Sequence, residues 1–548
     1  MNRRNPVCHL LQPLALFLLL ASGTGQAAQE SPVPLYDNLG TYHYRITTSD
    51  PQAQRYFDQG LRLYYAFNHQ EAIRAFSEAA RLDPACAMCN WGVALSLGPN
   101  INAPMDPAAA EPALAALQRA REGQADAAER TLIEALATRY ASPPPEDRSA
   151  LDRAYAEAMG KAVRLYPDNQ DAAALYAEAL MDLSPWQYWE PDGEPRPDTP
   201  QILAQLERVI AANPQHPGAC HFFIHAVEAV QPERAVPCAE RLAGLMPGAG
   251  HLVHMPGHIY IRVGRYEDAI RANEHAVHAD ETFIRDQNPA FGVYVAGYYP
   301  HNYDFLAFAA SMIGRSEQAL AASRKIAELV PEPMLREPGM TFLQHHMTRH
   351  LQMDVRFGRW EELLAVPAPP TDLPHARGMW HYARGRALVA QGDADAAGDE
   401  LAALRTIAQD PRMAELRMEF NSSGAVLAIA SQVLEGQIAA GQGKPQEAAE
   451  HLREAARLED ALTYGEPPEW TVPVRQELGN VLLDAGQNEA AEQTFREDLR
   501  RFPDNGWSLH GLARSLQAQQ RTEEAGEVRK RLERIWSGAD VSLAASGR

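Results

Sequence analysis

The sequence has few cysteines, no excess of positive charge and no long apolar run beyond its N-terminus. Its 548 residues include 50 Lys and Arg against 71 Asp and Glu, a net charge of −21 at pH 7. Nucleic-acid binding needs a basic surface, so this balance argues against a nucleic-acid partner. Five cysteines in a chain of this length do not make a disulfide scaffold. A membrane-spanning helix takes about 20 apolar residues, and no segment after residue 27 provides them.

Several catalytic signatures are also missing. The sequence contains no glycine-rich phosphate loop, no nucleophile elbow and no His-Glu-x-x-His zinc-protease motif. No Val-, Ile- or Thr-rich run alternates with polar residues in the manner of a β-strand. What remains is an ordinary globular composition, 46% hydrophobic and 22% charged, which excludes a wholly disordered chain.

The N-terminus has the three parts of an export signal. Arg3 and Arg4 supply positive charge, Leu14–Leu20 forms a short apolar core, and Gly25-Gln26-Ala27 is a small-x-small cleavage site. We therefore expect residues 1–27 to be a cleavable signal peptide, and the mature chain to be periplasmic or secreted in a bacterium. The alternative is an uncleaved anchor, which the short core disfavours. No stable membrane insertion is expected once the signal is removed.

Small and aromatic residues recur in a common frame along the rest of the chain. Within residues 56–84, Gly60 and Ala72 allow two helices to approach closely, and Pro84 ends the second helix. Equivalent positions recur at Gly257, Tyr260, Gly264, Tyr266, Ala269 and Ala276, at Ala307, Gly314, Ala319 and Pro331, at Gly385, Gly392 and Ala397, at Gly436, Gly443, Ala448 and Ala455, and at Gly479, Gly486, Ala491, Phe495 and Pro503. This pattern resembles the tetratricopeptide repeat (TPR), a 34-residue helix–turn–helix unit.

The resemblance implies an all-α fold, an α-solenoid of TPR-like repeats that binds a partner along its concave side. Such a fold does not fix the ligand. The expected organisation is a signal peptide (1–27), an N-terminal extension (28–48), N-terminal repeats with insertions (49–215), histidine-rich repeats (216–350), C-terminal repeats (351–536) and a flexible tail (537–548).

Proline- and aromatic-rich segments interrupt the repeats. They are residues 98–104, 184–199, 280–300, 331–339 and 367–374. Regular repeats keep their connections short, so these insertions either cover a surface and shape a pocket or are tolerated surface loops.

Histidine is concentrated in one part of the chain. Nine of the 19 histidines lie between residues 216 and 301. Two sets have helical spacing, namely His221, His225 and Glu228, and His251, His254 and His258. Each set shares one face of a helix. Corresponding histidines of the two sets are 33 residues apart, close to one repeat length, so the sets are expected on neighbouring first helices.

The TPR frame predicts where these side chains point. In the family, positions 2, 5 and 9 of the first helix line the concave groove, and here they fall on His251, His254 and His258. The following repeats place His301 and Asp304 at positions 2 and 5, and His345 at position 2. Pro256 argues against this geometry, because a proline inside a helix removes a backbone hydrogen bond and kinks the helix. If the helix instead begins near Met255, His251 and His254 lie on the entering loop.

These residues predict a transition-metal site of Cu, Zn, Fe or Mn, since neutral imidazole is the commonest ligand for such ions. The candidate ligands are His221, His225, Glu228, His251, His254, His258, His301 and Asp304. Met255 and the four cysteines of the mature chain would add soft ligands for copper. Histidines on a groove also suit peptide binding through hydrogen bonds and stacking.

The cysteines are the second candidate. Cys86 and Cys89 form a C-x-x-C motif at a helix start, which can be a disulfide, a redox centre or a metal ligand pair. Asn90 follows in place of His, so haem attachment is not supported. We expect a structural disulfide or buried thiols. For Cys220 and Cys238, the offset between antiparallel helices disfavours a bond.

Three hypotheses follow. The first is an exported TPR binding or scaffold protein with a His/carboxylate metal site in its groove. The second is a metal-dependent enzyme, an oxidoreductase or hydrolase, on the same site. The third is a metal-free adaptor whose groove holds a peptide or partner protein.

Overall fold

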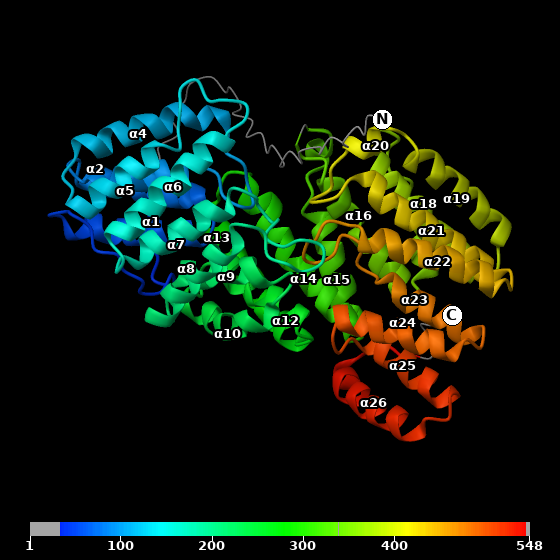
Figure 1. Ribbon diagram of the computed structural model, residues 1–548. Coiled ribbons are helices and arrows are strands. Elements are labelled where there is room, and N and C mark those ends of the chain that lie inside the picture. The colour runs from blue at the N-terminus through cyan, green and yellow to red at the C-terminus, as the bar shows by residue number, and fades with distance from the viewer. Residues whose placement is uncertain (1–32, 338, 544–548) are drawn as a thin grey trace, which may run out of the picture.

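The fold is all-α. The computed structural model describes residues 33–337 and 339–543, and α-helices make up most of this range (Figure 1). Among these residues there is no β-strand, only isolated bridges such as that between Cys86 and Gln124. The predicted α-solenoid of TPR-like repeats with insertions is confirmed. The predicted signal peptide, residues 1–27, lies outside the described residues. No described helix is both long and apolar enough to cross a membrane.

The helices follow one another mostly as antiparallel neighbours. The first half contains α1 (Pro51–Tyr65), α2 (His69–Leu82), α3 (Ala87–Ser96), α4 (Ala110–Glu122), α5 (Ala127–Ala137), α6 (Ser149–Leu165), α7 (Gln170–Met181), α8 (Thr199–Ala212), α9 (Pro217–Val227), α10 (Val236–Leu245), α11 (Gly250–His254), α12 (Pro256–Arg262) and α13 (Tyr266–Gln287). The second half contains α14 (Tyr299–Met312), α15 (Ser316–Glu328), α16 (Leu343–Arg356), α17 (Trp360–Ala365), α18 (Pro374–Ala390), α19 (Ala394–Ala408), α20 (Arg412–Glu415), α21 (Ser423–Gly441), α22 (Pro445–Asp460), α23 (Val474–Asp484), α24 (Asn488–Arg501), α25 (Gly506–Ala518) and α26 (Thr522–Ile535).

Glycine and phenylalanine hold successive helices together in the way the repeat frame predicts. Phe76 on α2 lies between Gly60 on α1 and Gly92 on α3, and a Cβ atom at either glycine would come within 2.6 Å of its ring. Phe495 on α24 lies in the same way between Gly479 and Gly511. The aromatic side chain of each second helix therefore fills the space that the glycines of its neighbours leave.

The C-terminal helices fold back against the middle of the stack. Gly264 and Gly314 end first helices with φ angles of 77° and 76°, which favour glycine. A Cβ atom at Gly264 would lie 2.7 Å from the carbonyl oxygen of Pro503, and one at Gly314 would lie 2.3 Å from the ring of Trp536. In Figure 1 the orange and red helices α24 to α26 accordingly lie below α15. The solenoid thus closes on itself on this side.

The predicted interruptions separate helices, with one exception. Residues 98–104 lie between α3 and α4. Residues 184–199 connect α7 to α8, which begins at Thr199. The break predicted from residue 280 is wrong in its position, because α13 continues to Gln287 and the chain leaves the helix at Asn288, which has a left-handed φ of 44°. A π-helical turn, η3 (Tyr294–Tyr298), then leads into α14. Beyond residue 280 the helix keeps an apolar contact, because the half-buried Phe283 lies 5.5 Å from Tyr294 between ring centroids.

Both ends of the described chain contact the repeats. In the extension, Asn38 O accepts a hydrogen bond of 2.8 Å from Gly248 N, and Tyr42 donates to the carboxylate of Asp171. Residues 537–548 are predicted to be a flexible tail, and the structure describes them as far as residue 543. Within this described part, the Asp540 carboxylate accepts hydrogen bonds from Ser316 N and Glu317 N at the start of α15, and so caps a helix of the central repeats.

The four described cysteines form two disulfides. Cys86 and Cys89 are bonded, which agrees with one of the expected alternatives. Cys220 and Cys238 are also bonded, with Cα atoms 5.2 Å apart, so the expectation that their offset prevents a bond is wrong. The chain reverses direction after Glu228, midway between the two cysteines. It then runs back along α9 as a 3-10 turn, η2 (Pro232–Ala235), before α10 begins.

Candidate metal centre

The histidine-rich helices are neighbours near the centre of the molecule. Helix α9 carries His221 and His225, helices α11 and α12 carry the second set, and α14 carries His301. Met255 keeps helical angles (φ −50°, ψ −36°), and His258 N donates to Met255 O, so the chain stays helical past Pro256. The shared face predicted for the second set is therefore present, and the alternative in which the helix begins near Met255 is wrong.

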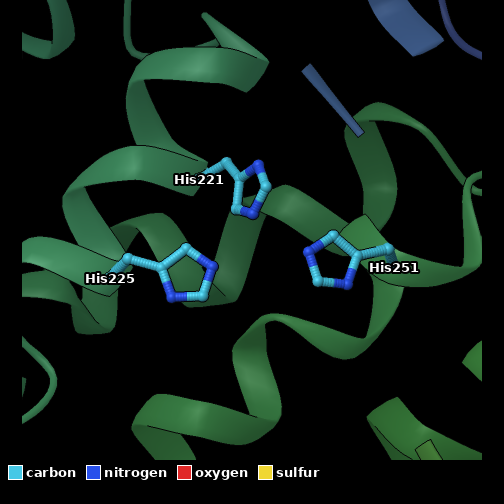
Figure 2. A group of neighbouring side chains, drawn as sticks. All are labelled: His221, His225 and His251. Atoms are coloured by element: carbon cyan, nitrogen blue, oxygen red, sulfur yellow. The ribbon is translucent and has the colours of Figure 1, made fainter. Parts of the chain in front are cut away.

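His221, His225 and His251 form a triad, which we call the first triad. Each offers a nitrogen, and these atoms lie within 4.8 Å of one another. Figure 2 shows the three rings turned toward a common space, two from one helix and one from the facing segment. Neighbouring repeats thus bring together residues that are 30 positions apart in the sequence.

Hydrogen bonds fix which nitrogen the first two rings present. His221 Nδ1 lies 2.7 Å from Tyr65 O, which can only accept, so this nitrogen carries the proton. His225 Nδ1 lies 3.0 Å from Glu228 Oε1. The Nε2 atoms of His221 and His225 and both nitrogens of His251 are buried without a hydrogen-bond partner. Acceptors placed like Tyr65 O and Glu228 Oε1 orient metal-ligating histidines in proteins.

Burial keeps these rings neutral. Burial, followed by repulsion from neighbouring histidines, lowers the pKa of His221 and of His251 well below the usual range. Burial also lowers the pKa of His225, although the hydrogen bond to Glu228 opposes this. A neutral imidazole has a free lone pair, so the triad is in the protonation state that a metal ion needs.

Aromatic side chains enclose the first triad. The Phe67 ring lies 4.4 Å from His221 between centroids, Tyr298 lies 4.4 Å from His251, and Trp186 lies 5.0 Å from His225. Phe67 and Trp186 have φ angles of 54° and 64°, which are unusual for large side chains. Strain of this kind is typical of ligand-binding sites.

These aromatic residues were not identified from the sequence. Phe67 lies in the turn between α1 and α2, where no helical register points to it. Trp186 belongs to the insertion 184–199, whose aromatic content was the available signal. Asn273 on α13, which binds His254 Nδ1 at 2.7 Å, was also missed.

A second triad lies beside the first. His254, His258 and His301 also offer nitrogens that lie within 4.8 Å of one another. The centroids of His225 and His258 are 5.4 Å apart, so rings of the two triads are in contact. Burial lowers the pKa of His254 and of His301 well below the usual range.

Glu228 lies between the triads. Its carboxylate is fully buried and binds Nδ1 of His225 through Oε1 and Nδ1 of His258 through Oε2. Burial opposes ionisation, but attraction to His258 and the hydrogen bonds from both rings outweigh it and lower the pKa of Glu228 to about 2. Glu228 therefore accepts a hydrogen bond from one ring of each triad.

Two of the predicted positions belong to other contacts. The Asp304 carboxylate forms a buried ion pair with Arg349, whose Nε donates to it at 2.8 Å. His345 Nδ1 lies 3.2 Å from His375 Nε2, in a separate pair. The structure thus brings together seven of the eight candidate ligands, from His221 to His301, and leaves Asp304 with Arg349.

Five of the six candidate histidines are buried, and His301 on α14 is half-buried. The side chains of His221 and His254 have no exposed surface, and His225 is 3% exposed. The prediction that these histidines line an open concave groove is therefore wrong for the five buried ones, because side chains such as Phe67 and Trp186 pack against their rings. The disulfides also remove all four described cysteines as thiolate ligands.

The comparison with family models agrees with the repeat fold. Residues 477–540 match the tetratricopeptide repeat family model. No curated protein matches the chain. Among solved structures, the human IFIT1 dimer with m7Gppp-AAAA is 14% identical, covering 89% of this chain and 91% of that chain, with a TM-score of 0.32. The APC/C hetero-tetramer Cut9-Hcn1 is 12% identical, covering 90% of this chain and 75% of that chain, with a TM-score of 0.29.

The TPR match and the paired helices define the class of the protein. The match covers residues 477–540, and paired helices of the same kind make up most of the described chain, so the fold is an α-solenoid with TPR repeats, the architecture of a repeat scaffold. The TM-scores of the solved structures are too low to add to this assignment.

Proposed function

We propose that this chain is an exported TPR scaffold that binds a transition-metal ion on His221, His225 and His251. The observation that supports this proposal most directly is that four imidazole nitrogens of these residues are buried without a hydrogen-bond partner. Each unpaired buried polar group costs about 1–3 kcal/mol, and native proteins retain such groups mainly where they serve a purpose. A bound metal ion supplies the missing partner for one nitrogen of each ring.

The donor set favours zinc, copper or iron over manganese. Three imidazoles suit the first group, whereas manganese prefers oxygen ligands. Met255, which lies between His254 and His258 in the sequence, is buried. The four described cysteines are disulfide-bonded, so they do not provide the soft thiolate ligands that would favour copper.

The two disulfides support export. Disulfides persist in oxidising compartments such as the bacterial periplasm, and they are rare in the cytosol. The signal-like N-terminal sequence and the bonded pairs Cys86–Cys89 and Cys220–Cys238 are consistent with one another. We propose a periplasmic or secreted location on these grounds.

A metal-dependent enzyme is the second candidate. Three protein ligands are the number found in catalytic zinc sites, which keep one position for water or substrate, whereas structural sites use four. The aromatic enclosure of the first triad would exclude bulk water from such a position. Hydrolytic or oxidative turnover by the metal-loaded protein, lost on metal removal, would favour this candidate over a scaffold.

Elemental analysis of the untagged mature protein, purified without chelator, tests the proposal. We expect His221→Ala/His251→Ala to lose one tightly held metal ion per chain. His275→Ala/His278→Ala is the matched control, because these two histidines are exposed on α13, and it should retain the wild-type content. A wild-type protein that holds no metal even after reconstitution would instead indicate the metal-free adaptor for a peptide or protein partner.

A further inference from the structure

In the second triad, the hydrogen bonds of His254 and His258 leave two ring nitrogens facing each other, an arrangement that a cation would stabilise. Asn273 Nδ2 donates to Ala269 O at 2.8 Å, so Asn273 Oδ1 is the acceptor that faces His254 Nδ1. Glu228 Oε2 likewise accepts from His258 Nδ1 at 2.5 Å. A neutral imidazole carries one N–H, and in both rings it is used at Nδ1.

The remaining nitrogens of these rings face each other. His254 Nε2 and His258 Nε2 are 2.8 Å apart, and in the neutral rings both atoms present lone pairs. Two lone pairs at this distance repel unless a positive charge lies against both. Either a proton shared between the rings or a metal ion bound by both supplies that charge.

His301 distinguishes the two possibilities. A shared proton needs only two nitrogens, yet His301 from α14 brings a third to within 4.8 Å of the others. Its ring centroid lies 4.9 Å from that of His254 and 5.7 Å from that of His258. Three imidazoles from three helices repeat the donor set of the first triad, and this number suits a metal ion.

We propose that the chain binds two transition-metal ions, one on each triad, and that Glu228 serves both as a shared outer carboxylate. Because His225 and His258 each use Nδ1 to bind Glu228, their Nε2 atoms are left for the two ions. The Glu228 carboxylate, which is hydrogen-bonded to one ring of each triad, would offset part of the positive charge of two neighbouring ions. This inference extends the proposed function, and its test separates the two.

Metal titration of the apoprotein measures the stoichiometry. With Zn²⁺ as the probe, followed by calorimetry and native mass spectrometry, we expect two ions per wild-type chain. His254→Ala/His301→Ala and His221→Ala/His251→Ala should each bind one ion, and the quadruple variant none. The variant with both exposed α13 histidines replaced, His275→Ala/His278→Ala, should bind two.

The outcomes are distinguishable. One ion in the wild type that persists in His254→Ala/His301→Ala would overturn the second site and leave the proposed function intact. One ion that persists in His221→Ala/His251→Ala would contradict the proposed function and leave the second triad as the only site. The wild-type stoichiometry decides the proposal even if a variant fails to fold.

Electron paramagnetic resonance of the Cu²⁺-loaded protein gives an independent measurement. Since the triads are in ring contact, two Cu²⁺ ions should couple, and the signal should broaden or fall as loading rises from one to two equivalents. In His254→Ala/His301→Ala the signal should remain that of isolated Cu²⁺. An additive, uncoupled signal at two equivalents in the wild type would overturn the paired arrangement.

Discussion

Single acceptor atoms decide which nitrogen each histidine presents to the centre. Tyr65 O holds Nδ1 of His221, and Glu228 holds Nδ1 of His225 and His258, so Nε2 of each ring is left for a ligand. The histidine spacing could be taken from the sequence, but these acceptors could not. Tyr65 is 156 residues from His221, and only the packing of α1 beside α9 brings its carbonyl there.

Glu228→Gln tests the role of the shared carboxylate. The variant keeps the size of the side chain but loses its charge, so we expect metal affinity to fall about 10–100-fold, the usual effect of losing an outer-shell partner. The number of bound ions should stay the same, as measured by Zn²⁺ titration. Glu240→Gln, at an exposed position on α10, is the control. Unchanged affinity would contradict the outer-shell role, and loss of an ion by a folded variant would show that Glu228 is itself a ligand.

Because of Glu459 on α22, which lies outside both triads, we expect the free energy of unfolding to depend on pH. Burial, reinforced by repulsion from Asp498 and opposed by Arg501, raises the pKa of Glu459 to about 8 from an ordinary value of 4.5. The folded state therefore holds a proton that the unfolded state releases. This contribution is fully present below about pH 4.5 and is lost as the pH rises to about 8.

Urea unfolding at pH 5 and pH 8 measures this effect. In the wild type, Glu459 should lower the free energy of unfolding by on the order of a few kcal/mol as the pH rises from 5 to 8. Glu459→Gln should remove this decline. Glu450→Gln, at an exposed position on the same helix, should decline as the wild type does. The interpretation fails if Glu459→Gln and the wild type show equal slopes.

At the scale of helices, small residues set the distances between neighbours. The sequence pattern predicted the paired helices because Gly60, Phe76 and their counterparts have fixed spacing within a repeat. It failed where the determinant lies outside the repeat. The bond between Cys220 and Cys238 depends on where the chain reverses after α9, and the cover over the histidines depends on the backbone of Phe67 and Trp186.

Two glycine variants test how helices pack. Gly511→Ala would place a Cβ atom 2.1 Å from the ring of the fully buried Phe495, so we expect a loss of about 1–3 kcal/mol in stability. Gly526→Ala on α26 meets no atom within 4 Å and should gain about 0.5–1 kcal/mol. Thermal and urea unfolding give both values. A change of the same sign in both variants would contradict the account of packing.

At the scale of the whole molecule, the C-terminal repeats close the solenoid against its central repeats. Trp536 contacts Gly314, and its ring centroid lies 5.3 Å from that of Trp507, whose Nε1 donates to Ser311 O. The repeat pattern predicts the order of helices but not this contact, because it joins residues that are about 200 positions apart. Closure also buries the ends of α12 and α14, the helices that carry His258 and His301.

Trp536→Ala tests this closure. Loss of the indole should lower the free energy of unfolding by about 1–3 kcal/mol, since the ring is half-buried. Hydrogen exchange should rise at the turn between α14 and α15. Arg534→Ala, at an exposed position near the end of α26, should leave both unchanged. Unaltered exchange in Trp536→Ala would show that the contact does not hold the two parts together.

The central claim is that a metal ion lies between His221, His225 and His251. Anomalous diffraction at the absorption edge of the metal found by elemental analysis, on crystals of the untagged protein, tests it most directly. We predict a peak bounded by the three rings, about 2.0–2.1 Å from one nitrogen of each if the metal is zinc. A protein that retains its metal but shows no peak between these three histidines would contradict the account.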